Sequence, residues 1–311
     1  MFKLLLPLGL LSLFSLFVGV SPLSPASLLA GDPEALNLFL TSRLPRLFAI
    51  LLAGAGLSIA GLIMQQISQN RFAAPSTTGT IECAMLGYVL SLVFFGNGNQ
   101  LWLIFGVSVL GTLLFVTLIQ RIQFRNAVFV PLIGIIYGSI IDAGATFIAY
   151  KYDAVQMLSA WAIANFATIL RGDFELLYIA IPIAIFSYLY ATRISAVGMG
   201  KDFATGLGLR YQHVVLIGVM LVSIMSASVV MIVGTLPFLG LLVPNVVSLY
   251  YGDNLRKNIP LTAALGAALV LVCDIASRVI IFPYEIPVSM LVSILGGLAF
   301  IVLILKGQKH V

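Results

Sequence analysis

The sequence has few charged residues. Asp, Glu, Lys and Arg make up 9% of its 311 residues, 61% of the residues are hydrophobic, and the mean hydropathy is +1.13. A chain of this composition cannot bury its apolar side chains in a single water-soluble core. The basic residues form no stripe along the chain, so the net charge of +5 does not indicate a nucleic-acid partner. The composition predicts an integral membrane protein.

Cysteine and histidine are also scarce, which argues against a metal centre or a catalytic site. Cys83 and Cys273 lie far apart in apolar sequence, and His213 and His310 are the only histidines. The sequence contains no H-E-x-x-H or G-x-S-x-G motif and no pair of carboxylates at helical spacing within an apolar run. We expect no covalent chemistry, so an intramembrane enzyme is the least favoured class.

A phosphate-binding loop is missing as well. The segment GMGKD, residues 198–202, lacks the G-x-x-x-x-G-K-[ST] spacing, because Ser195 stands at the first glycine position and Asp202 follows the lysine. We therefore expect this chain to bind neither ATP nor another cofactor. Energy for any active process has to come from another subunit.

Apolar runs long enough to cross about 30 Å of hydrocarbon recur along the whole chain and predict membrane-spanning helices. Breaks at proline, glycine and charged residues give about ten spans in a single transmembrane domain of residues 1–311. The first run resembles a signal peptide, but we favour an uncleaved anchor, since an even number of spans leaves both termini in the cytoplasm. The predicted spans are 4–20, 46–66, 81–96, 101–119, 127–149, 175–191, 213–233, 236–251, 260–279 and 288–305.

The distribution of basic residues predicts the orientation. With the N-terminus in the cytoplasm, eleven of the 16 lysines and arginines fall on the cytoplasmic side, as the positive-inside rule requires. The other five fall outside: Arg43, Arg46, Lys151, Arg171 and Arg278. Arg43 and Arg46 flank Pro45 in the segment TSRLPR, where a topology signal alone would not place them.

Two interpretations of these outer arginines stay open. They are either interfacial anchors that reach lipid headgroups or a binding surface for carboxylates of a partner protein. Arg278 adds a third guanidinium group, and it follows Asp274 by four residues, a spacing at which the two side chains pair on one helix face.

Two long segments carry a resemblance to a known family. SRLPRLFAILLAGAGLSIAGLIMQQISQNRFAAPSTTGT resembles the R-L-P-R, G-A-x-L-x-x-x-G and Q-x-x-x-x-N-x-x-A-x-P elements of the permeases of iron-siderophore and vitamin B12 ABC importers. VGTLPFLGLLVPNVVSLYYGDNLRKNIPLTAALGAALVLVCDIASRVIIFPYEIPVSMLVSILGG resembles the second half of the same family, including D-x-x-x-R and E-x-P-V. The sequence of these segments is most similar to those of permeases for catecholate-type siderophores such as vibriobactin, anguibactin and petrobactin.

The resemblance implies an all-α polytopic fold of ten helices in two inverted-topology halves, the type II ABC importer permease fold. It implies that the chain works in the bacterial plasma (inner) membrane with two ATPase subunits, an identical or homologous second permease, and a periplasmic or lipid-anchored binding protein. In the family, arginines at the positions of Arg43, Arg46 and Arg278 meet acidic residues on the binding protein.

The resemblance also implies a contact with the ATPase in the cytoplasmic loop of about residues 195–212. This loop carries an A-x-x-L-G-L element, and Phe203 and Leu207 are spaced to form one apolar face. The alternative is an ordinary solvated connector. The expected coupling residues are Asp202, Phe203, Ala204, Gly206, Leu207, Gly208 and Leu209.

The translocation pathway is implied to run along the fifth and tenth spans. Its candidate residues are Tyr137, Ser139, Asp142, Ser289, Ser293 and Gly296. Asp142 is either a functional carboxylate or a structural acceptor for a neighbouring helix. Glu82 is predicted to cap a helix start rather than to relay protons.

The sequence therefore predicts a permease subunit of an ABC importer that moves ferric siderophore inward, with ATP hydrolysed on a separate subunit. Iron has to remain in its chelator, because the chain lacks a ligand set for the bare ion. The alternative is an ion-coupled secondary transporter, in which Asp142 and Glu82 would be the ion sites.

Overall fold

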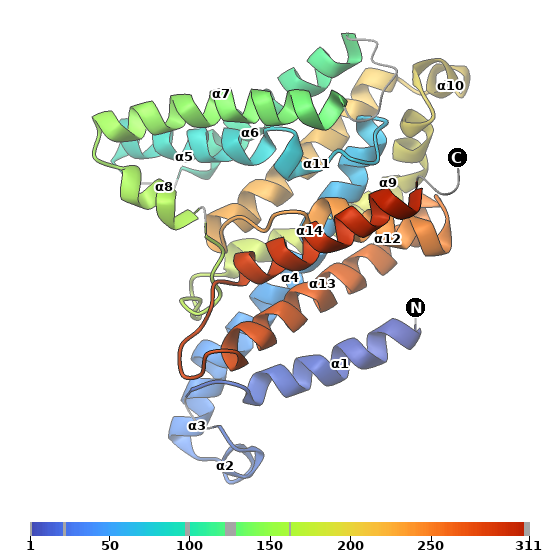
Figure 1. The fold of residues 1–311 in the computed structure, drawn as a ribbon. Coiled ribbons are helices and arrows are strands. Elements are labelled where there is room, and N and C mark those ends of the chain that lie inside the picture. Colours follow the sequence, from blue (N-terminus) through green and yellow to red (C-terminus); the bar gives the residue numbers. More distant parts are fainter. Residues whose placement is uncertain (1, 21–22, 97–99, 122–128, 162, 308–311) are drawn as a thin grey trace.

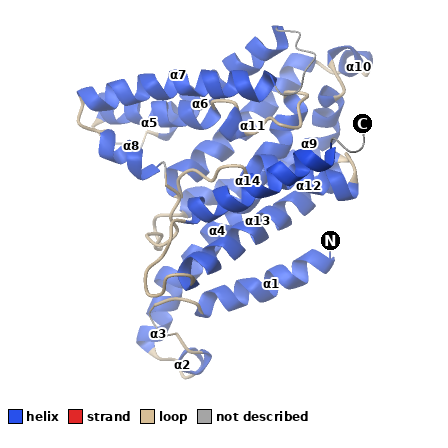
Figure 2. Cartoon of the chain, in the orientation of Figure 1, coloured by secondary structure: helices blue, strands red, loops and turns tan. Residues whose placement is uncertain are grey.

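The computed structural model of the chain describes residues 2–20, 23–96, 100–121, 129–161 and 163–307. These residues form helices joined by loops and turns, and no strand occurs among them (Figures 1 and 2). Within these described ranges, six helical segments are long and apolar enough to cross a membrane, and four apolar helices are shorter. The chain is thus an all-α, multi-pass membrane protein.

The ten apolar helices correspond one to one with the ten predicted spans. Their boundaries differ from the predicted ones by a few residues at most ends, and the first two residues of the predicted span 127–149 lie outside the described residues. The helices are α1 (Phe2–Phe17), α4 (Leu44–Ile67), α5 (Thr80–Phe95), α6 (Leu101–Arg121), α7 (Phe129–Lys151), α9 (Ala180–Gly198), α11 (Tyr211–Ile232), α12 (Leu239–Tyr251), α13 (Leu255–Val279) and α14 (Val288–Gly307).

Short helices lie between the spans. They are α2 (Pro25–Leu29), α3 (Pro33–Leu38), α8 (Val155–Trp161) and α10 (Lys201–Gly206). The sequence did not predict α2, α3 or α8, since helices of five to seven residues are too short to show a hydrophobic period.

The second span is longer than predicted. A π-helical turn, Phe39–Arg43, joins α3 to α4, so the helical segment runs without a break from Pro33 to Ile67. Pro45 lies in the first turn of α4. Proline has no N–H to donate, but the π-helical turn needs no donor at this position. The helix therefore continues through the proline that the sequence suggested as its beginning.

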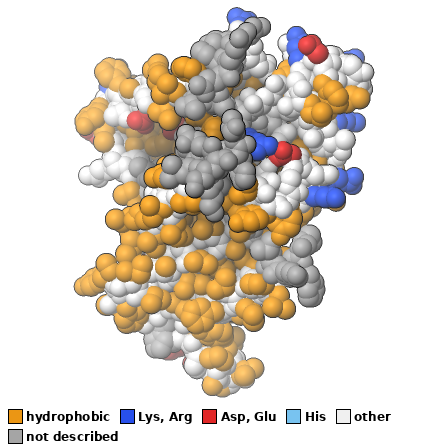
Figure 3. Space-filling model, turned by 45° about the vertical axis from the view of Figure 1, so that its right-hand side comes forward, with side chains coloured by type: hydrophobic (Ala, Val, Ile, Leu, Met, Phe, Trp, Pro, Cys, Tyr) orange, Lys and Arg blue, Asp and Glu red, His pale blue; other side chains and the backbone are white. Residues whose placement is uncertain are grey.

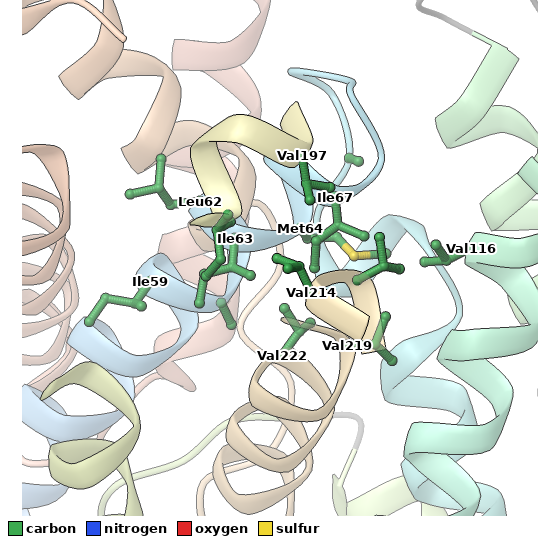
Figure 4. Packing of buried hydrophobic residues seen from close by; sticks show 14 of the residues in the cluster. Ile59, Leu62, Ile63, Met64, Ile67, Val116, Val197, Val214, Val219 and Val222 are labelled. Carbon is green, nitrogen blue, oxygen red and sulfur yellow. The ribbon is translucent and has the colours of Figure 1, made fainter. Parts of the chain in front are cut away.

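Helix α4 is the centre of the fold. It packs against α13, α11, α12 and α9, and α11 connects this group to a second group formed by α5, α6 and α7 (Figure 1). One face of α4 contributes Ile59, Ile63 and Met64 to a buried apolar cluster that Val214 and Val222 of α11 complete (Figure 4). Close packing of such side chains is what associates helices inside a bilayer.

Glycines allow α4 to approach two neighbours very closely. A Cβ atom at Gly54 would lie 2.7 Å from the carbonyl oxygen of Gly266 on α13, and one at Gly61 would overlap the backbone of Gly240 on α12. Small residues at such positions let two helix backbones come into contact. The G-A-x-L-x-x-x-G element of the sequence thus has a packing role at both of its glycines.

The two ends of the molecule differ in character. Helix α3 and the beginning of α4 lie at one end, and α10 lies at the other (Figure 1). Lys and Arg side chains gather at the α10 end, whereas hydrophobic side chains cover the body of the molecule in the view of Figure 3. This arrangement places the arginines of TSRLPR and the loop around α10 at opposite ends.

Candidate functional site

The first candidate site is an ionic cluster at the α3 end. We call Arg43, Arg46, Asp274, Arg278 and Glu285 the arginine cluster. The Arg46 guanidinium group donates hydrogen bonds from Nε (3.1 Å) and Nη2 (2.7 Å) to Asp274 Oδ1, from Nη1 to Glu285 Oε1 (3.0 Å), and from Nη2 to Glu285 Oε2 (2.8 Å). Arg46 therefore joins α4 to α13 and to the loop that leads into α14.

The other two arginines hold helix α1. Arg278 pairs with Asp274, donates from Nη1 to the carbonyl oxygens of Ser15 (2.9 Å) and Val18 (2.8 Å), and donates from Nη2 to the Ser15 hydroxyl (2.5 Å). Arg43 Nη1 donates to the same Val18 oxygen at 2.6 Å. Both cations lie at the C-terminal end of α1, where the helix dipole favours positive charge.

All three arginines are buried in the chain itself. Their exposed fractions are 8% for Arg43, 7% for Arg46 and 3% for Arg278. The ion pair between Asp274 and Arg278 that the spacing predicted is confirmed. The single chain does not expose these arginines as a surface for a partner, because acceptors within the chain bind their guanidinium groups.

Glu285 was not predicted from the sequence to be a partner of Arg46. The two residues are separated by 239 positions, so no local spacing connects them. Charge balance could have indicated this pair. Glu285 is the only acidic residue after Asp274, and its segment is predicted to lie on the same side of the membrane as three arginines.

The second candidate site is helix α10 at the opposite end. Gly200, with φ +113°, separates α10 from α9, and Gly208, with φ +77°, ends the turn that follows α10. These left-handed conformations favour glycine and make the short helix possible at this point. The predicted coupling segment is thus a helix with its own defined boundaries.

The predicted coupling residues differ in exposure. Ala204 is completely buried against the chain, so its side chain cannot reach a partner, and Leu209 is half-buried. Phe203 and Leu207 are 45% and 61% exposed, and Met199 just before the helix is 65% exposed. The remaining predicted residues are exposed, namely Asp202, Gly206 and Gly208.

Two neighbouring grooves lie at the α10 end, and the first of them borders α10. The first has a volume of about 330 Å³ and lies between α9, α10 and the beginning of α13. The second has a volume of about 410 Å³ and is more polar. Three residues line both grooves, namely Ser195, Met199 and Leu255. The polar groove is lined in part by Gln65, Gln66, Gln69, Asn70, Arg71, Asp253 and Asn258.

The predicted pathway residues of α7 lie on a partly open face. Ser139 and Asp142 are exposed, and Tyr137 is half-buried and donates a hydrogen bond to the Gly111 carbonyl oxygen at 2.9 Å. The Ser139 hydroxyl donates to the Ile135 carbonyl oxygen within its own helix. Within the described residues, no basic side chain forms an ion pair with Asp142.

The predicted pathway residues of α14 are less accessible. Ser289 is 9% exposed, and Ser293 is half-buried with its hydroxyl bonded to the Ser289 carbonyl oxygen. Gly296 is buried, and a Cβ atom there would lie 2.8 Å from Cβ of Phe238. Gly296 therefore serves the packing of α14 and offers no side chain to a passing solute. Helices α7 and α14 pack against different neighbours, α5 and α8 for the first, α12 and α13 for the second.

Glu82 lies in the first turn of α5, the helix-start position that the sequence predicted. Its carboxylate approaches Gly138 of α7, where a Cβ atom would be 3.2 Å from Glu82 Cδ. The oxygen Oε2 is buried and has no hydrogen-bond partner among the described residues. A helix N-terminus favours negative charge, which suits the capping interpretation.

Comparisons with known proteins agree over nearly the whole chain. The FecCD transport family matches residues 5–306. The chain is 44% identical to the petrobactin import system permease protein YclN of Bacillus subtilis, over 97% of this chain and 96% of that protein. It is 37% identical to the ferric-anguibactin transport system permease protein FatD of Vibrio anguillarum, over 99% of both chains. A solved metal-chelate type ABC transporter in an inward-facing conformation has a TM-score of 0.80 and 25% identity, over 98% of both chains.

Proposed function

Because this chain belongs to the FecCD transport family, we propose that it is the transmembrane permease subunit of an ABC importer that moves ferric siderophore into the cytoplasm. The observation that carries the proposal is the end-to-end match with permeases named for petrobactin and ferric-anguibactin import. The chain is a translocation subunit and not an enzyme. The ion-coupled alternative has no such support. The cargo class we propose is a catecholate-type siderophore whose iron stays in its chelator.

We place the α10 end and both termini in the cytoplasm of a bacterium and the α3 end outside its plasma membrane. Figure 3 supports this orientation, since Lys and Arg gather at the α10 end and basic residues favour the cytoplasmic side. ATP is hydrolysed on two separate subunits. A second permease, identical or homologous, completes the pathway that one chain leaves partly open at Ser139 and Asp142.

Helix α10 is the proposed contact with the ATPase. Phe203, Leu207 and Met199 expose apolar surface next to a groove, at the end of the molecule where charged side chains otherwise gather. An exposed apolar patch bordered by polar residues is typical of a protein interface. The proposed coupling surface consists of α10 and this groove, with Ala204 holding the helix to the chain rather than meeting the partner.

Reconstitution tests the proposed function. Liposomes that contain the permease with its ATPase subunits, supplied with binding protein and ferric siderophore, are expected to accumulate iron when ATP is added on the ATPase side. No ion gradient is needed for this uptake. Uptake that follows a proton or sodium gradient and ignores ATP would contradict the proposal.

Replacing Gly206 with tryptophan tests the coupling surface. Gly206 is exposed and a Cβ atom there meets nothing within 4 Å, so the isolated chain offers open space where the larger side chain begins and a docked partner would not. We expect Gly206→Trp to lower ATP-driven uptake about tenfold or more, because a tight interface does not accept a large added side chain. Gly106→Trp is the matched control, since a Cβ atom on α6 is equally unhindered. Full transport by Gly206→Trp would remove α10 from the interface.

Asp142 is expected to be dispensable. Its side chain is exposed and belongs to no ion pair among the described residues, so Asp142→Asn removes a charge without breaking an ion pair there. We expect ATP-driven uptake to stay within about twofold of wild type at every workable pH. Complete loss of uptake in a folded complex would show instead that this carboxylate takes part in transport.

A further inference from the structure

The arginine cluster raises a difficulty for the docking of a binding protein on Arg43, Arg46 and Arg278, which the family resemblance implies. A guanidinium group offers five N–H donors in a planar fork, and it binds a partner's carboxylate only when that fork is available. In this structure the carboxylates of Asp274 and Glu285 together occupy the Nε, Nη1 and Nη2 atoms of Arg46. These contacts use four of the five N–H donors, so two-point docking of a further carboxylate at Arg46 requires one internal carboxylate to leave.

The two internal carboxylates differ in their freedom to leave. The Asp274 side chain is completely buried within α13 and also pairs with Arg278, whereas the Glu285 side chain is 22% exposed. Glu285 lies in the connection between α13 and α14, next to Tyr284, which is 74% exposed. A loop residue at the edge of the cluster separates from Arg46 with little disturbance of helix packing, and Asp274 does not.

The Glu285 carboxylate also has the geometry that an external carboxylate would adopt. Its two oxygens accept from Nη1 and Nη2 of Arg46 at 3.0 and 2.8 Å, the parallel two-point arrangement of an arginine fork. The contact is partly open to solvent on the Glu285 side, where a partner at the outer face would arrive.

The charge balance favours exchange over simple opening. Three guanidinium groups and two carboxylates give the closed cluster one net positive charge. Departure of Glu285 without replacement would leave a buried arginine with less compensation, which is costly. A carboxylate from an acidic partner restores the balance, so the two events belong together.

From these observations we propose that Glu285 is an internal substitute for the carboxylate of the docking partner, and that docking exchanges one carboxylate for the other on Arg46. The inference rests on the proposed function and on the acidic binding protein that the family resemblance implies. Because Glu285 is three residues before Val288, where α14 begins, the exchange releases this connection from Arg46, while the Ile286 N–H still donates to the Ser277 carbonyl oxygen. Docking at the outer face is thereby linked to the position of α14.

The role of Arg43 and Arg278 differs from that of Arg46 in this scheme. Arg278 is bound to the Ser15 and Val18 carbonyl oxygens of α1, and Arg43 donates to Val18. A side chain at Gly19 would overlap the Arg43 guanidinium group, so the end of α1 fits closely over it. These two arginines keep α1 in place, and Arg46 is the one whose partner can change.

The exchange and a purely structural ion pair predict different effects of removing the Glu285 charge on the Kd of the binding protein. The substitution Glu285→Gln keeps the size of the side chain and removes its charge, so the internal competitor binds Arg46 less strongly. The probe is the binding protein that supports uptake in the reconstituted system, titrated onto the complete transporter in nanodiscs. We expect its Kd to fall on the order of tenfold, with a steeper dependence on salt.

The matched control is Glu175→Gln. Glu175 is an exposed carboxylate in the segment that reaches the same end of the molecule through the hydrogen bond between Arg171 N–H and the Thr41 carbonyl oxygen. The substitution removes the same charge without touching the cluster. We expect it to leave the Kd within about twofold of wild type, in keeping with the small effect of an exposed charge.

A second measurement applies even if Glu285→Gln does not fold. An environment-sensitive dye on Tyr284→Cys reports the loop directly, while the native Cys83 and Cys273 are buried and remain unlabelled. Docking is expected to shift the dye signal, and a constant signal on docking overturns the exchange. Docking on wild type that is not tightened by Glu285→Gln in a folded complex also overturns it. A binding protein that fails to dock on wild type would overturn the proposed function first.

Discussion

Gly61→Ala is expected to destabilise the folded permease strongly. A methyl group at this position would overlap the backbone carbonyl group of Gly240, and backbone atoms cannot rotate away as a flexible side chain does. Helices α4 and α12 would have to move apart and lose the close contact that associates helices in a bilayer. Overpacking of a rigid contact typically costs about 1–3 kcal/mol, and we expect a value at or above the upper limit here.

The measurement is the fraction of the extracted protein that elutes as a single peak in mild detergent, followed by its thermal unfolding. Gly106→Ala is the matched control, because it makes the same chemical change in α6, where a Cβ atom meets nothing within 4 Å. That control is expected to be neutral or stabilising by up to about 1 kcal/mol, from the better helix propensity of alanine. Equal behaviour of the two variants would show that α4 and α12 are not in rigid contact.

The helices could be predicted from sequence because each span carries its own signal. Long apolar runs interrupted by proline, glycine and charge mark α4, α7, α11 and α13 regardless of what surrounds them. The start of the second span was the exception. Arg43 and Pro45 suggested a boundary near residue 46, but the helical segment begins at Pro33, since a π-helical turn accommodates the proline.

The depth of the arginines could not be predicted in the same way. The positive-inside rule assigns Arg46 to a side of the membrane and says nothing about burial, which depends on residues distant in sequence. Asp274 and Arg278 are four residues apart on one helix, so their pairing was visible. Glu285 reaches Arg46 only because α4 and the α13–α14 connection meet in the fold. Contacts of this kind come from tertiary structure.

The coupling segment shows a similar limit. The sequence indicated the region, and Phe203 and Leu207, whose spacing suggested an apolar face, are both exposed. It could not separate Ala204, which packs against the chain, from Gly206, which lies open. Helix propensity indicates whether a helix forms. Which face of α10 is buried depends on its contacts with α9 and α11.

The cluster around Asp274 links three helices that are far apart in sequence. Asp274 on α13 accepts from Arg46 on α4 and from Arg278, and Arg278 in turn holds the end of α1. Removing the shared acceptor therefore affects more than one contact. Arg278, at 3% exposure, would be left buried with only uncharged partners, the carbonyl oxygens and the hydroxyl of α1.

Asp274→Asn is expected to destabilise the protein by about 3–5 kcal/mol, the usual cost of leaving a buried charge without its counter-ion. Asparagine keeps the volume of the side chain, so the loss reports charge and not a cavity. On the scale of a domain of 150–250 residues this corresponds to an apparent Tm lower by on the order of 10 °C. A thiol-reactive dye can follow unfolding, because both cysteines are buried in the native fold.

Asp253→Asn separates this effect from a general response to lost charge. Asp253 pairs with Arg71 at 2.7 Å, but the two side chains are 62% and 66% exposed, so the pair is screened by solvent. We expect its removal to cost less than about 1 kcal/mol. A Tm of Asp274→Asn as high as that of Asp253→Asn would mean that α1, α4 and α13 are held together by apolar packing alone. The cluster would then contribute to docking without contributing to the fold.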